Sequence, residues 1–250
     1  MVSISAILQL HAAKIFIRFE KPTEAKHQKI YKVLKSNNRQ MLGESIKYLE
    51  GLYTWTDDVQ IVVASCGSIN SRYEPDRQLV VLCYESLHRK IYNYAEAASS
   101  KAIFERRVFQ NSMFTFWHEI GHVVLDQLDL ANGLDSIQIE LLADEFATLS
   151  LIWREGSRYK DVVLINALHF KSQSMRQSDK KYKAHPKDQL RYEKMITLLY
   201  GFKQKSYSRL SDEVGQIEWL NMPAKEYYFE RSAYWEQNLR KHTKFDFFNN

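Results

Sequence analysis

The chain has 250 residues, 45% hydrophobic and 26% charged, which is enough for a folded domain with a sizeable core. Its net charge of +5 is scattered along the sequence without a recognition motif, which argues against a nucleic-acid binder. No run approaches the roughly 18 apolar residues that span a membrane, so we expect no transmembrane segment.

Residues 1–13 form a terminal segment to which no role is assigned, and residues 14–245 are expected to form a single domain. The N-terminal stretch is mildly apolar but lacks the basic region of a signal peptide. The sequence therefore predicts a soluble protein and leaves open whether it is cytoplasmic or exported. It does not predict an oligomeric state.

The first third of the chain contains strand and helix patterns in turn. Residues 14–19 alternate and predict a strand, and residues 25–53 follow a 3.6-residue period that predicts two helices broken near residues 36–38. Two apolar runs rich in β-branched residues, 58–65 and 77–84, predict neighbouring strands of a small sheet.

The two cysteines, Cys66 and Cys83, lie at the ends of these two strands. If the strands pair as a hairpin with a wide loop, the thiols lie close enough for a disulfide bond. Two free thiols in a reducing compartment are the alternative, and the residues alone leave both open.

From residue 86 onward the pattern is almost entirely helical. The predicted helices span residues 86–98, 102–128, 136–156, 159–173, 185–201 and 222–242. Ser136 is a candidate cap of the third, and Pro186 suits the first turn of the fifth. A small N-terminal sheet followed by packed helices predicts an α+β fold.

The segment TFWHEIGHVV contains two histidines four residues apart, His118 and His122, which face the same side of a helix. Two imidazoles at this spacing can bind one Zn²⁺, and Glu119 beside them can act as a general base. About 0.02 such matches are expected by chance in a chain of this composition. The alternative, an ordinary core helix, would bury two imidazoles without partners.

A catalytic zinc site needs a third protein ligand. Leu125 and Leu128 stand where another class of zinc peptidase has Gly and His, which excludes that class. Glu140 follows a short loop that lets the next helix pack antiparallel, so it is the expected ligand, with Glu145 as the rival. Asp144, one turn after Glu140, is expected to accept the outer N–H of a ligand histidine.

Polar residues also begin the helix predicted at 185–201. His185 and Arg191 are candidates to stabilise the negative charge that builds on the carbonyl oxygen during amide hydrolysis, and Tyr182 is another. In the alternative, His185 caps the helix and Arg191 pairs with Asp188. The residues alone do not choose between these readings.

The motifs resemble known zinc peptidases. HEIGH followed by ELLADEFA resembles the gluzincin metallopeptidases, named for their glutamate ligand. A closer similarity is to a family of soluble bacterial proteins, described only as metallopeptidases and classed as a domain of unknown function. It rests on CGSINSRYEP, LCYES, HEIGH, ELLAD and HPKDQLR in that order, and covers residues 14–240. Leu190 departs from the Gln that is usual in the family.

The resemblance implies a zincin-like body with an active-site helix and a glutamate-ligand helix, Zn²⁺ as cofactor, and a peptide or protein substrate. The implied site comprises the ligands His118, His122 and Glu140, the general base Glu119, Asp144 behind the ligands, and His185 and Arg191 nearby. Many members have signal peptides, which favours the Cys66–Cys83 bond.

Two functions are therefore weighed. The first is a zinc-dependent metallopeptidase, a metalloendopeptidase of the gluzincin type. The alternative is a binding or regulatory module that contains zinc but has no peptidase activity. Glu119 favours the first, because a purely structural zinc site does not need a base.

Overall fold

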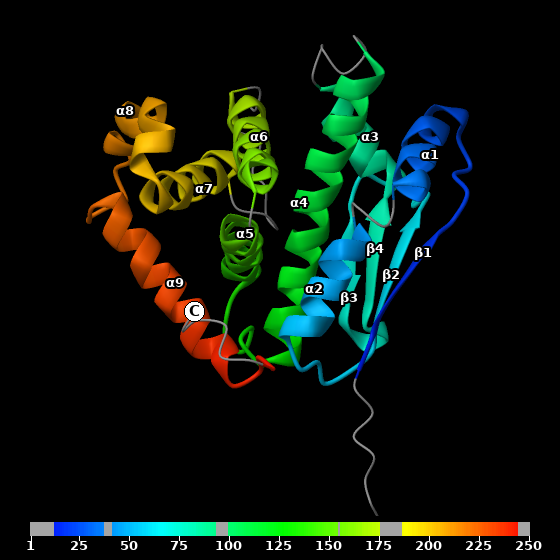
Figure 1. Cartoon of the computed structure of the whole chain (residues 1–250), viewed down its shortest axis with the longest axis horizontal. Helices are drawn as coiled ribbons and strands as arrows, with labels where there is room; N and C mark the ends of the chain where they lie inside the picture. Colours follow the sequence, from blue (N-terminus) through cyan, green and yellow to red (C-terminus); the bar gives the residue numbers. More distant parts are fainter. Residues whose placement is uncertain (1–12, 38–41, 94–99, 155, 176–186, 245–250) are drawn as a thin grey trace, which may run out of the picture.

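The computed structural model describes residues 13–37, 42–93, 100–154, 156–175 and 187–244. The expected α+β class is confirmed, since a small sheet near the N-terminus is followed by a mostly helical body (Figure 1). The strands are β1 (Ile15–Phe19), β2 (Val59–Ala64), β3 (Arg72–Glu74) and β4 (Leu79–Cys83). The long helices are α1 (Gln28–Ser36), α2 (Glu44–Leu52), α3 (Tyr84–Tyr92), α4 (Lys101–Gln127), α5 (Ser136–Trp153), α6 (Ser157–Ser174), α7 (Asp188–Phe202) and α9 (Ala224–Arg240).

Shorter helical segments complete the described part of the chain. They are the 3₁₀ turns η1 (Ala25–His27), η3 (Pro75–Arg77) and η5 (Gln204–Leu210) and the single turn α8 (Ser211–Gly215). Within the described residues, no helix combines the length and the apolar character needed to cross a membrane.

The sheet has the strand order β1-β2-β4-β3, in which β1, β2 and β4 are parallel and β3 runs antiparallel to β4. The two apolar strands, β2 and β4, are therefore neighbours as expected, but they do not form the hairpin that was considered for a Cys66–Cys83 bond. Residues 65–78 between them are long enough for a parallel connection, which needs about a dozen residues. The hairpin partner of β4 is β3, which lies within this connection. The turn between β3 and β4 is formed by η3 and by Gln78, which has a left-handed conformation with a φ of 46°.

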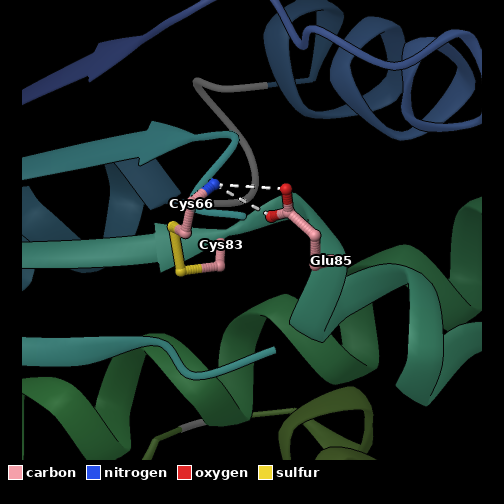
Figure 2. Close-up of side chains that lie close together, drawn as sticks. All are labelled: Cys66, Cys83 and Glu85. Carbon is pink, nitrogen blue, oxygen red and sulfur yellow. Dashed lines mark hydrogen bonds between the residues drawn. A yellow bond between two sulfur atoms is a disulfide. The ribbon is translucent and has the colours of Figure 1, made fainter. Parts of the chain in front are cut away.

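The parallel pairing brings the carboxyl ends of β2 and β4 to the same edge of the sheet. Ala64 of β2 pairs with Cys83 of β4, and the structure joins Cys83 to Cys66 by a disulfide bond there (Figure 2). In an antiparallel hairpin the end of β2 would lie beside the start of β4, far from Cys83. Contact between the thiols thus depends on the parallel arrangement.

α4 is the central helix of the molecule, between the sheet with α3 on one side and α5 with α6 on the other (Figure 1). The hydroxyl of Ser100 caps its first turn by accepting from Ile103 N at 3.2 Å. Nearly every residue from Phe104 to Leu125 is buried, as expected for a helix with apolar residues on all faces. The histidine motif therefore lies in the middle of a rigidly packed helix.

We expect that replacing both Cys66 and Cys83 by Ser lowers the free energy of unfolding by about 3 kcal/mol. The bond links residues 17 apart, and its loss frees a loop of that length in the unfolded chain. Denaturant unfolding under non-reducing conditions measures the change. A reductant should produce the same shift in the wild type and none in the double variant; a wild type insensitive to a reductant that opens the bond would contradict the prediction.

Candidate metal centre and active-site cleft

Side chains of α4 and α5 bring three donor atoms together. The Nε2 atoms of His118 and His122 lie 3.3 Å apart. A carboxylate oxygen of Glu140 lies 3.5 Å from each of these nitrogens. His118 is nearly buried, whereas His122 and Glu140 are partly exposed and line a cleft.

These separations and donor types fit a zinc-class ion. Donors about 2.0–2.1 Å from a tetrahedral ion lie about 3.4 Å from one another. The three observed distances, 3.3, 3.5 and 3.5 Å, are close to this value. Burial and neighbouring His118 lower the pKa of His122 to about 4, so this imidazole has a lone pair to offer at pH 7. Burial also lowers the pKa of His118, but Asp144 outweighs it and raises the pKa to about 9, so an ion that binds His118 has to displace a proton.

The candidate ligands meet because α4 and α5 approach closely at Gly121. A Cβ atom at Gly121 would lie 2.9 Å from both Cα and O of Ala143, a distance that real Cβ atoms essentially never show. Only glycine therefore allows this packing. Since the helices are antiparallel, His118 faces Asp144 on one side of the contact and His122 faces Glu140 on the other.

The turn between α4 and α5 ends in a well-defined cap. Asp135 accepts from Gln138 N at 2.8 Å, and the Gln138 side chain accepts from Asp135 N at 2.9 Å, which forms a capping box. The expected cap, Ser136, is instead the first helical residue, because the carboxylate one position earlier occupies the cap. Gly133 in this turn has a φ of 78°, which favours glycine.

Asp144 connects the candidate ligand His118 to Arg191. Its Oδ1 accepts from His118 Nδ1 at 2.8 Å, which orients Nε2 toward the cleft. Arg191 donates from Nε at 2.5 Å and from Nη2 at 2.7 Å to the same carboxylate. Burial raises the pKa of Asp144, but Arg191 and His118 outweigh it and lower the pKa to about 2. Arg191 is thus hydrogen-bonded to α5 through Asp144.

Glu145, the rival ligand, faces away from His118 and His122. Its carboxylate accepts hydrogen bonds from Arg231 Nε at 2.9 Å and from Trp235 Nε1 at 2.8 Å, both on α9. The adjacent carboxylates of Asp144 and Glu145 on α5 therefore bind different partners. Asp144 belongs to the candidate centre, and Glu145 attaches α5 to the C-terminal helix.

Glu119 is almost completely buried next to the two histidines, with 3% of its surface exposed. Burial raises the pKa of its carboxyl to about 7, although His118 acts in the opposite direction. Lys90, which sequence reasoning missed, lies near it and donates to Thr115 Oγ1 at 2.8 Å. The sequence could have indicated this position, because Lys90 follows the buried Leu87 by three residues and therefore lies on the same, inward face of α3.

The candidate centre opens into a cleft of about 1170 Å³. One wall is formed by residues 69–73, which include the start of edge strand β3, and by α3. The opposite wall comes from α6 and α7 and includes His169 and Phe170, which sequence reasoning also missed. The volume exceeds the roughly 300–1,000 Å³ of small-molecule sites, which suits a chain-like substrate.

Three residues of the sequence prediction, Tyr182, His185 and Pro186, lie outside the described residues. The roles suggested for Tyr182 and His185 stay predictions. Arg191, from the same stretch of sequence, is described and lines the cleft.

We expect Gly121→Ala to lower the free energy of unfolding by about 1–3 kcal/mol, the usual range for an overpacked contact. Because the added methyl group separates α4 from α5, the affinity for Zn²⁺ should fall as well. Thermal unfolding and chelator competition measure the two effects. Gly51→Ala is the matched control, since no atom lies within 4 Å of its added Cβ; equal behaviour of the two variants would refute this account of the packing.

Asp144→Asn should lower Zn²⁺ affinity about 10–100-fold, because the ligand His118 loses its charged partner. It should also lower the free energy of unfolding by about 3–5 kcal/mol, since Arg191 loses the carboxylate to which it donates two hydrogen bonds. Chelator competition and denaturant unfolding test both effects. The exposed Asp161→Asn on α6 should change neither, and unchanged metal affinity in Asp144→Asn would contradict the role assigned to this carboxylate.

Comparison with protein-family models matches residues 19–239 to the family described as "Putative metallopeptidase". Comparison with curated proteins finds no match, and neither does comparison with solved structures. The matched segment extends from the end of β1 into α9 and includes every residue of the candidate centre. The chain therefore belongs to this family of putative metallopeptidases, DUF4344, which supports a metal-dependent peptidase in general.

Proposed function

We propose that the chain is a zinc-dependent endopeptidase of the gluzincin type. Its ligands would be His118, His122 and Glu140, and Glu119 would be the general base. The observation that carries the proposal is the convergence of three zinc-type donors within 3.5 Å of one another at the base of a large cleft. The buried carboxylate of Glu119 beside them supplies the group that a purely structural site does not need.

The residues present divide the chemistry between them. A bound zinc ion would polarise the scissile carbonyl and lower the pKa of a water molecule to about 7. Glu119 would accept a proton from this water and pass it to the leaving amine, because its carboxylate is buried beside the two candidate ligand histidines.

Asp144 and Arg191 act behind the ligands. Asp144 holds Nδ1–H of His118, which leaves Nε2 as the donor toward the ion. Because two N–H groups of Arg191 are engaged with Asp144, we assign Arg191 a positioning role and not direct contact with the carbonyl oxygen. The stabilising group for that oxygen stays with the predicted His185 or Tyr182.

A peptide or protein substrate is supported by the family and by the size of the cleft. We further propose that residues 14–245 form one domain. One cluster of buried apolar side chains extends from Ile15 in β1 to Leu239 in α9, so the sheet and the helices share a core.

We expect Glu119→Gln to reduce peptide hydrolysis at least about 100-fold, because the amide cannot accept the proton. Zinc content should stay the same, since Glu119 is not a ligand. Cleavage of an unbiased peptide library and metal analysis test the two statements. Glu105→Gln, on the first turns of the same helix and away from the cleft, is the control. Absence of hydrolysis in both the wild type and Glu119→Gln would favour the non-catalytic module.

A further inference from the structure

A second set of metal-type side chains lies around His27, which is completely buried. Neither of its ring nitrogens has a hydrogen-bond partner among the described residues. Nδ1 lies 4.0 Å from Oε1 of Glu24, beyond hydrogen-bond distance. Each unsatisfied buried polar group costs about 1–3 kcal/mol, so an imidazole in this position favours a partner that the described residues do not supply.

Two carboxylates approach this histidine from different parts of the chain. Glu24 precedes η1, and Glu85 lies in the first turn of α3. One oxygen of each and a nitrogen of His27 lie within 4.8 Å of one another. Glu85 is held in place by backbone N–H groups, from Cys66 at 3.1 and 3.2 Å and from Gly67 at 3.2 Å, and Figure 2 shows its carboxylate turned toward Cys66 N.

The same spacing occurs on both elements. Glu24 precedes His27 by three residues, and Glu85 precedes His88 by three. In α3 this is the Glu-x-x-His spacing with which a helix presents a carboxylate and an imidazole to one metal ion. Glu24 has an extended backbone before η1, so the first pair shares the spacing but not the helical geometry. The ring of His88 lies 5.2 Å from that of His27, centroid to centroid, so a second imidazole is within reach of the same position.

From these contacts we propose a second metal site, in which His27, Glu24 and Glu85 bind a divalent first-row transition metal such as Zn²⁺ or Mn²⁺, with His88 as a further ligand. Imidazole together with carboxylate suits these ions better than Mg²⁺ or Ca²⁺, which prefer oxygen ligands alone. The site shares no residue with His118, His122 and Glu140, and it does not rest on the proposed peptidase activity.

Charge and flexibility allow an ion to bind here. Lys26 pairs with Oε2 of Glu24 at 2.7 Å, which leaves Oε1 toward His27. Glu24 and Glu85 contribute two negative charges and Lys26 one positive charge, which favours a cation. The carboxylate of Glu24 is 47% exposed, so it has room to move toward an ion at this position.

The bound ion would connect two parts of the structure that the chain itself links only distantly. It would join η1 to α3, and through Glu85 it would support Cys66 and Gly67 at the end of β2. The residues that follow, 69–73, form a wall of the active-site cleft. The second site therefore has a structural role in holding this wall.

Metal counting on the full chain without an affinity tag tests the proposal. After loading with Zn²⁺ and gel filtration, elemental analysis should find two equivalents per wild-type chain. His27→Gln should retain one equivalent, and the double variant His118→Ala, His122→Ala should also retain one. The second site would be overturned if the wild type bound one equivalent of Zn²⁺, His27→Gln still bound it, and the double variant did not. If the wild type bound one equivalent of Zn²⁺, His27→Gln bound none and the double variant still bound one, the result would support the second site and contradict the proposed peptidase centre.

A surface variant covers the case in which His27→Gln fails to fold. Glu24→Gln removes a half-exposed ligand and should weaken the second site at least tenfold in a Zn²⁺ titration, with an unchanged thermal midpoint in the presence of a chelator. Glu20→Gln, an exposed carboxylate paired with Arg18, is the control and should bind like the wild type. Equal affinities of the second equivalent in Glu24→Gln and the wild type would overturn the assignment.

Discussion

The close packing of α4 against α5 at Gly121 determines how the candidate centre is built. Because the helices are antiparallel and their backbones almost touch there, each turn of α4 faces one turn of α5. His118 and His122, one turn apart, therefore meet Asp144 and Glu140, which are also one turn apart. A bulkier residue at position 121 would push the helices apart and separate both pairs at once. Gly121 therefore controls the distances between the side chains of the candidate centre.

The packing also places charged groups in the interior, where they need partners. Asp144 is 3% exposed and stays ionised because His118 and Arg191 surround it. Buried ion pairs of this kind add little to net stability, but removal of one member is costly. Arg191 in turn stacks on Phe170, with its guanidinium 4.0 Å from the ring centroid, so the same cation attaches α7 to both α5 and α6. Arg191 therefore has two roles: through Asp144 it helps to orient the candidate ligand His118, and through Phe170 it holds the wall of the cleft formed by α6 and α7.

Sequence reasoning located most helices because their apolar period is long and their ends carry turn-forming residues. It also identified His118, His122 and Glu140 as one group, since the helical repeat and a short reversing loop fix their relative positions. It failed where the answer depends on pairing between distant segments. β3 has three residues, too few for an alternating pattern, and the parallel pairing of β2 with β4 has no local signal. The partner of Arg191 and the place of Lys90 likewise depend on how helices pack in three dimensions.

The candidate ligands and the proposed base all come from one stretch, residues 118–140, whereas the walls of the cleft come from segments before and after it. Residues 69–73 contact neither Asp144 nor Arg191 in the hydrogen bonds described above, so substitutions there can alter the cleft without changing the groups of the proposed centre. Reaction and recognition are therefore free to evolve separately in this molecule.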